Sequence, residues 1–133
     1  MTPEQTLCVN SLVYRSDVFN YVIDHLRSQG CKSVDGDKDE KFCAYRGAEG
    51  TMCAVGALIT DDEYNSDWET LSIAGLLEES DLPSSLRKRL IAHEEMVQDL
   101  QNFHDSELYY IDGVFSVDSE DRLVELQTVW NIK

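Results

Sequence analysis

Apolar positions along the chain recur mostly at the three- and four-residue spacing of amphipathic helices. Thr2 is a suitable N-cap, Pro3 suits the first helical turn, and the apolar repeat then continues until Gly30 supplies a stop. Ser16 offers a second cap within this stretch. The pattern therefore predicts either one long N-terminal helix or two shorter ones.

Three more helices are predicted further along the chain. A modest one is marked by Ile73, Leu76 and Leu77 and is broken near residues 81–83, and a last one begins at Ser116 or Ser119. Between them, residues 84–105 carry an apolar stripe that is typical of one long core-facing helix. Both His93 and His104 fall on the buried side of that helix or at its edge.

Two hairpins complete the expected fold. Residues 42–46 and 51–55 are strand-like and are joined by a glycine-containing turn, and residues 109–117 predict a second hairpin through Asp112 and Gly113. No repeat or linker divides the chain. We therefore expect one small α+β domain over residues 1–133, mainly helical, with one or two short β-hairpins.

The register of the first hairpin decides what its cysteines can do. An even-numbered turn opposes Cys53 to Ala44 and leaves Cys43 on the other face, whereas a three-residue loop opposes Cys43 to Cys53. Only the second register brings the two thiols close together. Their C-x9-C spacing lacks the tight pairs of a zinc site, so we expect packed thiols without a metal or other cofactor. Cys8, on the apolar side of the first helix, is also predicted to be in the core.

The charge of the chain is strongly acidic and unevenly spread. Twenty-six acidic and eleven basic side chains give a net charge of −15, and residues 47–86 and 90–121 contain no lysine or arginine. Such a surface repels nucleic acid and anionic membranes and attracts basic protein surfaces. A solvated acidic surface that only maintains solubility is the other interpretation. The chain shows no apolar run long enough for a membrane span and no signal-peptide pattern, so we expect a cytoplasmic protein.

Three residues could form a catalytic site: Cys43, Cys53 and His104. A reactive thiolate needs a nearby histidine or cation, and His104 would supply a base if the long helix ended against the hairpin. Adjacent helical residues do not face each other, so we expect no contact between His104 and Asp105 from adjacency alone. The common hydrolase, phosphate-binding, dinucleotide and zinc-protease motifs are absent. We therefore expect binding rather than catalysis.

Three stretches carry a resemblance to known proteins: HLRSQGCKS, CAYRGAEGTMCAVGALITDDEY and LQNFHD. They resemble a set of small bacteriophage and prophage proteins that have no assigned activity. The likeness covers residues 24–64 and 100–105, and Thr60 stands where that set commonly has proline. The resemblance implies a phage setting inside a bacterial host.

Two functional hypotheses follow from these patterns. The first is an acidic, phage-type protein that binds the basic surface of a host nucleic-acid-handling or defence protein and inhibits it by imitating nucleic-acid charge, without contacting nucleic acid or membrane itself. Self-repulsion favours a monomer, unless an apolar interface overrides it. The alternative is a hydrolase or metal-dependent enzyme built on Cys43, Cys53 and His104. The candidate binding residues of the first hypothesis are Asp61, Asp62, Glu63, Tyr64, Asp67, Trp68 and Glu69.

Overall fold

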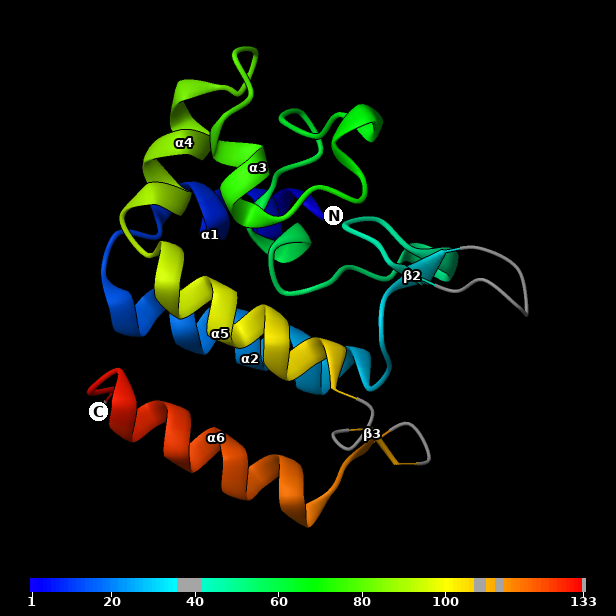
Figure 1. The fold of residues 1–133 in the computed structure, drawn as a ribbon, viewed down its shortest axis with the longest axis vertical. Coiled ribbons are helices and arrows are strands. Elements are labelled where there is room, and N and C mark those ends of the chain that lie inside the picture. The colour runs from blue at the N-terminus through cyan, green and yellow to red at the C-terminus, as the bar shows by residue number, and fades with distance from the viewer. Residues whose placement is uncertain (36–41, 107–109, 112–113, 133) are drawn as a thin grey trace.

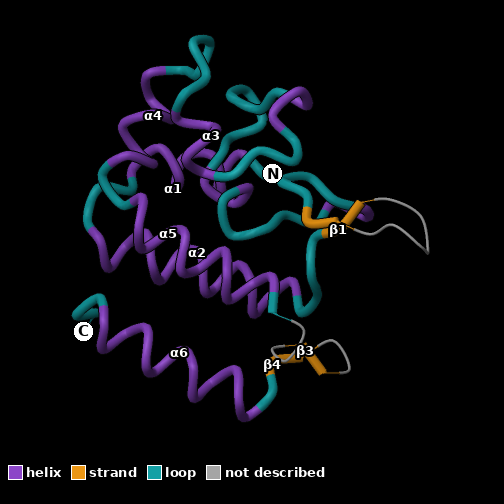
Figure 2. The backbone as a smooth tube through the Cα atoms, in the orientation of Figure 1, coloured by secondary structure: helices purple, strands orange, loops and turns teal. Residues whose placement is uncertain are grey.

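The protein is a small, mainly helical domain, seen here in a computed structural model that describes residues 1–35, 42–106, 110–111 and 114–132. Two helices, α2 and α5, lie side by side at its centre (Figure 1). Helix α6 lies along one side of this pair, while α1, α3 and α4 lie on the other (Figure 2). The helices are α1 (Pro3–Ser11), α2 (Arg15–Gln29), α3 (Ile73–Leu77), α4 (Ser84–Ile91), α5 (Glu94–Asp105) and α6 (Val117–Val129).

The N-terminal region forms two helices. Thr2 caps α1 by accepting a hydrogen bond from the backbone N–H of Gln5 (3.1 Å), as predicted. Ser16 is not the second cap, because α2 begins after Tyr14, which makes no side-chain capping bond. Gly30 ends α2 in the left-handed conformation, with φ of 69°. Cys8 was predicted to be in the core, and this is wrong: α1 buries only Val9 and leaves the Cys8 thiol exposed.

The single long helix predicted over residues 84–105 is wrong. His93, with φ of −134° and ψ of 27°, separates α4 from α5. Its ring lies 2.9 Å from the carbonyl oxygen of Val13, which ties the junction to the loop after α1. Leu90 and Val97 are fully buried on either side of the break. The apolar spacing therefore continues across the junction and gives no sign of it.

The first predicted hairpin is also wrong, in both registers. Strand β2 (Phe42–Cys43) pairs antiparallel with β1 (Val34–Asp35), not with residues 51–55. The short 3-10 turn η1 (Ala48–Gly50) follows instead, closed by a bond from the N–H of Gly47 to the carbonyl of Thr51 (2.9 Å). Cross-strand parity therefore does not relate the two cysteines.

A second two-residue ladder precedes α6. Strand β3 (Tyr110–Ile111) pairs antiparallel with β4 (Val114–Phe115), and the turn expected at residues 112–113 lies outside the described residues. Ser116 then caps α6. Because each ladder is two residues long, the helices dominate the described part of the fold.

The segment after η1 crosses the core in irregular backbone. Residues 52–60 are all buried and include the 3-10 turn η2 (Gly56–Leu58). Gly56 passes so close to the backbone of Tyr45 that a Cβ built on the glycine would lie 2.2 Å from the Tyr45 carbonyl oxygen. Only glycine fits there, and this contact replaces the ladder that the sequence suggests.

Among the described residues, no helix combines the length and apolar character required to cross a membrane.

Candidate functional site

A polar cluster joins the end of β2 to the end of α5. The Cys43 thiol donates a hydrogen bond to Oδ1 of Asp105 (2.6 Å), and the amide of Gln101 donates to the same oxygen (2.9 Å). Nδ1 of His104 lies 2.8 Å from that oxygen as well. One carboxylate oxygen therefore gathers three neighbours from two separate elements.

Contact between His104 and Asp105 contradicts the expectation that adjacent residues would not meet. Asp105 is the last residue of α5, so its side chain is not held in the outward direction of a helix interior. Its carboxylate therefore reaches the ring of the preceding residue. The rule that neighbouring residues do not face each other holds inside a helix but not at this helix terminus.

The hydrogen bonds fix the tautomer of the buried His104. The backbone N–H of Ser33 donates to its Nε2 (2.9 Å), so Nε2 carries no proton. The ring proton is then on Nδ1, where it is donated to Asp105. Nδ1 lies 3.9 Å from the sulfur of Cys43 but, carrying that proton, it is not a base for the thiol.

The cluster holds its groups in the opposite state to that of a cysteine nucleophile. Burial, together with the hydrogen bond to Asp105 and its charge, raises the pKa of Cys43 to about 12. Burial alone would raise the pKa of Asp105, but the hydrogen bonds from His104 and Cys43 outweigh it and hold that pKa below its usual value. A protonated thiol beside an ionised carboxylate is therefore the stable arrangement, and it disfavours thiolate chemistry.

These residues are also the donor set for a possible metal ion. One ligand atom from each of Cys43, His104 and Asp105 lies within 4.8 Å of the others. Ligation by the imidazole would have to use Nδ1, which holds the proton while Ser33 occupies Nε2. The geometry therefore fits a hydrogen-bonded cluster better than a metal centre.

Cys53, the third predicted catalytic residue, lies apart from this cluster. It is 1% exposed, and its sulfur accepts a hydrogen bond from the backbone N–H of Gly56 (3.3 Å). Burial raises its pKa to about 12. Cys43 and Cys53 line one hollow of about 250 Å³ together with Asp105, so the structure places them near one another without a direct contact that would activate either.

We expect two of the four thiols to react quickly with Ellman's reagent at pH 8, namely the exposed Cys8 and Cys31. Cys43 and Cys53 should react slowly, because their raised pKa leaves little thiolate at that pH. The reaction of Cys43 should accelerate as the pH approaches 12. The check is a time course on the C8S/C31S variant, in which any fast thiol at pH 8 would contradict this description of the cluster.

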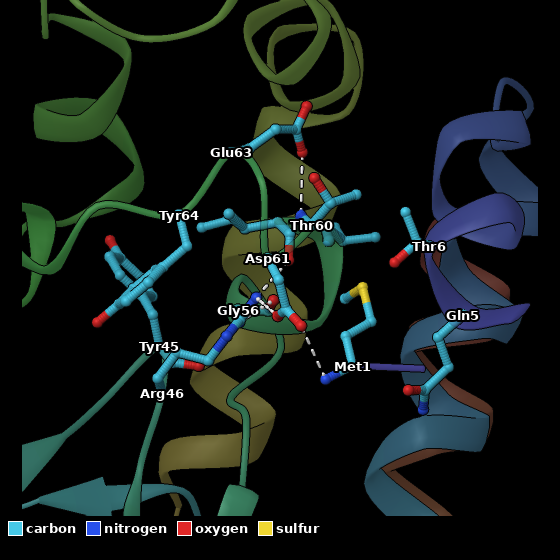
Figure 3. A network of polar contacts seen from close by, with 12 residues as sticks. Met1, Gln5, Thr6, Tyr45, Arg46, Gly56, Thr60, Asp61, Glu63 and Tyr64 are labelled. Atoms are coloured by element: carbon cyan, nitrogen blue, oxygen red, sulfur yellow. Dashed lines mark hydrogen bonds and ion pairs between the residues drawn. The ribbon is translucent and has the colours of Figure 1, made fainter. Parts of the chain in front are cut away.

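Asp61, the first of the predicted acidic binding residues, belongs to a network around Arg46 (Figure 3). The Arg46 guanidinium donates to the carbonyls of Gly56 (2.7 Å) and Ile59 (2.6 Å) and pairs with Asp61 (3.2 Å). It also lies 5.0 Å from the centre of the Tyr64 ring. Asp61 and Tyr64 therefore hold an internal arginine in place.

Glu63 is not a surface acid. Its side chain is 8% exposed, and its carboxylate pairs at 2.7 Å with Arg89, whose side chain is 5% exposed. Burial alone would raise the pKa of Glu63, but the bonds from Arg89 and Ser85 outweigh this and lower it. Glu63 is therefore a structural residue.

Trp68 and Glu69 also have structural roles inside the fold. Trp68, expected as an exposed anchor, is 3% exposed and packs in the core. The Glu69 carboxylate accepts bonds from the backbone N–H groups of Tyr45 (2.9 Å) and Arg46 (3.1 Å) and from the Tyr64 hydroxyl (2.5 Å). Asp61, Asp62 and Asp67 are the exposed members of the predicted set, and Asp61 is already paired.

Sequence reasoning missed the acceptor role of Asp105 and the buried pair of Glu63 with Arg89. The four-residue spacing of Gln101 and Asp105 was the available signal for the first, since such residues are neighbours on a helix. The sequence contains no comparable signal for the pair of Glu63 with Arg89, because these residues lie 26 positions apart.

The fold and this cluster define a small, mainly helical domain with a hydrogen-bonded cysteine, histidine and aspartate at one end. Comparison with models of protein families, with curated proteins and with solved structures gives no match.

Proposed function

We propose that this protein is a small acidic binding protein that occupies the basic, nucleic-acid-binding surface of a host protein and inhibits it. The observation that supports the proposal is the different use of the two signs of charge. Three of the six arginines, Arg46, Arg87 and Arg89, reach inward, whereas fifteen carboxylate side chains among the described residues are exposed. The net charge of −15 is therefore concentrated on the outside.

The inward arginines act mainly as donors to backbone carbonyls. Arg46 donates to the carbonyls of residues 56 and 59, Arg87 donates to those of Leu77 and Glu79, and Arg89 donates to that of Leu58. Arg87 in this way supplies donors at the C-terminal end of α3, where helical carbonyls lack partners. Bases engaged in this way do little to offset the exposed acids.

The resemblance to small phage proteins supports a bacterial host as the setting. Exposed carboxylates on a rigid domain can take the place of phosphates in contacts with lysine and arginine, and such contacts weaken steeply as salt rises. Asp62 and Asp67 remain the free-standing acids of the original candidate surface, since they are exposed.

Affinity capture from a bacterial lysate tests this function. We expect one nucleic-acid-binding protein to be retained at about 50 mM salt, to be lost by at least about tenfold at 200 mM, and to be displaced by duplex DNA. Capture of no such protein, or capture that salt and DNA leave unchanged, would contradict the proposal.

A matched pair of variants locates the surface. D62K/D67K and D24K/D121K each replace two exposed aspartates, and each raises the net charge from −15 by four units. Weaker capture by the first variant alone would assign the contact to residues 62 and 67. Equal weakening would indicate a contribution from the whole acidic surface.

A further inference from the structure

A groove runs along α5 beside α3. The hollow next to the Cys43 cluster has a volume of about 250 Å³, and a second hollow of about 560 Å³ lies toward the start of α5. Ile73 and Gln98 line both hollows, so the two lie end to end.

Acidic and apolar groups line this groove together. Glu69 and Asp105 are in the first hollow, and the second has Glu94, Glu95 and Asp99. No lysine or arginine is among the described residues that line either one. Apolar contact is offered by Leu71, Ile73, Ala74 and the ring of Trp130.

Trp130 gives the groove a wall suited to cations. Its indole N–H donates to the carboxylate of Asp99 (2.9 Å), which fixes the orientation of the ring. The Arg15 guanidinium of the same chain lies 5.9 Å from the ring centre. Trp130 also lines an adjoining hollow that contains Arg15, so one basic side chain of the same chain lies beside this end of the groove, whereas the carboxylate of Asp99 lies on the groove side.

We propose that this groove binds an extended, basic segment of a protein partner. The inference rests on the proposed function and identifies where the partner's arginines or lysines would lie. Charge selects the occupant, since the lining would repel phosphates or an acidic peptide and attract a cationic one. The apolar positions accommodate the stems of long basic side chains, and the Trp130 ring accommodates a guanidinium.

The length of the groove suits a short segment. Helix α5 spans twelve residues, from Glu94 to Asp105, and extends about 18 Å at 1.5 Å per residue. An extended peptide covers that distance with about five or six residues. Alternate side chains of such a segment could face the carboxylates at the two ends.

The probe for this inference is a fluorescent nonapeptide of alternating arginine and alanine, and the glutamate–alanine peptide is its control. We expect fluorescence anisotropy at low salt to show binding of the arginine peptide and none of the glutamate peptide. Absence of binding by the arginine peptide would overturn the groove proposal.

Two variants separate the groove from the general acidic field. Gln98 and Asn102 are bonded to each other on α5 (3.0 Å), so Q98K and N102K each lose that bond and each add one positive charge. Gln98 lines the groove at the junction of the hollows, whereas Asn102 is in neither lining. We expect Q98K to weaken peptide binding about tenfold and N102K less than about threefold. Equal weakening would overturn the assignment to the groove.

The same variants distinguish this inference from the proposed function. If Q98K still captures the salt-sensitive host protein as wild type does, the groove is not the contact surface although the protein remains an acidic inhibitor. If no host protein is captured yet the peptide result depends on Gln98, the groove binds basic segments and the proposed function fails. Thermal unfolding of both variants confirms that each is folded.

Discussion

Replacing Arg89 by methionine is expected to lower the free energy of unfolding by about 3 to 5 kcal/mol, because one partner of a buried ion pair is removed. The guanidinium bonds to both oxygens of Glu63 and to the buried carbonyl of Leu58. All of these acceptors lose a donor in R89M, while methionine retains much of the volume. Urea unfolding followed by circular dichroism measures the effect.

The double variant R89M/E63Q is the control for this prediction. Glutamine keeps one acceptor oxygen for the Thr60 N–H, presents an NH2 group that donates to the Ser85 hydroxyl oxygen, and removes the unpaired charge. The double variant should therefore recover a large part of the loss. A cost below about 1 kcal/mol for R89M would show that the pair does not stabilise the fold.

The pH dependence of stability gives an independent check. The folded-state pKa of Glu63 lies below its usual value of 4.5, so the contribution of the pair is present above pH 4.5 and is lost as the pH falls through the folded pKa. In R89M this part of the acid-induced loss should be absent. The difference between the two unfolding free energies should therefore shrink as the pH falls below 4.5.

Replacing Gly56 by alanine is expected to destabilise the fold by at least about 3 kcal/mol, the upper part of the range for overpacking. The new Cβ would lie 2.2 Å from the carbonyl oxygen of Tyr45 and 2.9 Å from its carbonyl carbon. These are backbone atoms, and the N–H of Tyr45 is itself held by Glu69 (2.9 Å). Relief would need a shift of both segments, and calorimetric unfolding should show a markedly lower Tm.

Gly75→Ala is the matched control for Gly56→Ala. Gly75 lies within α3, and a Cβ there would meet its nearest neighbour at 3.5 Å, an ordinary contact. Because alanine favours a helix over glycine, this variant should be stabilised by about 0.5 to 1 kcal/mol. Similar effects of the two substitutions would contradict the close approach at Gly56.

Local signals in the sequence predicted the parts of the fold that depend on local chemistry. The Thr2 cap, the stop at Gly30 and a short helix carrying Ile73, Leu76 and Leu77 are confirmed. Each is set by a residue and its near neighbours. The mainly helical character follows from the same kind of signal.

The prediction of the first hairpin was wrong because the backbone pairing of this segment depends on residues far away in the sequence. Residues 42–46 and 51–55 do have strand-like composition, but Gly56 packs on Tyr45 and Glu69 binds the N–H groups of Tyr45 and Arg46. A side chain more than twenty positions away therefore takes the donors that a ladder would need. Spacing within the segment contains no information about that partner.

In the candidate site too, the sequence identified the residues, whereas their chemistry depends on distant partners. The sequence singled out Cys43 and His104, and the structure brings them to 3.9 Å. Their chemistry depends on Ser33, whose N–H selects the histidine tautomer across 71 positions of sequence. Only the folded arrangement shows that Asp105, not His104, receives the thiol hydrogen bond.

The inward arginines have a consequence for how this surface can evolve. Arg46, Arg87 and Arg89 supply donors that backbone carbonyls require, so their number is fixed by the architecture. Exposed acids such as Asp24 and Asp121 have no comparable structural duty in the described contacts, so they can be exchanged at little cost to folding. Mutation and selection can therefore adjust the negative charge toward a new partner while these three positive charges remain in place.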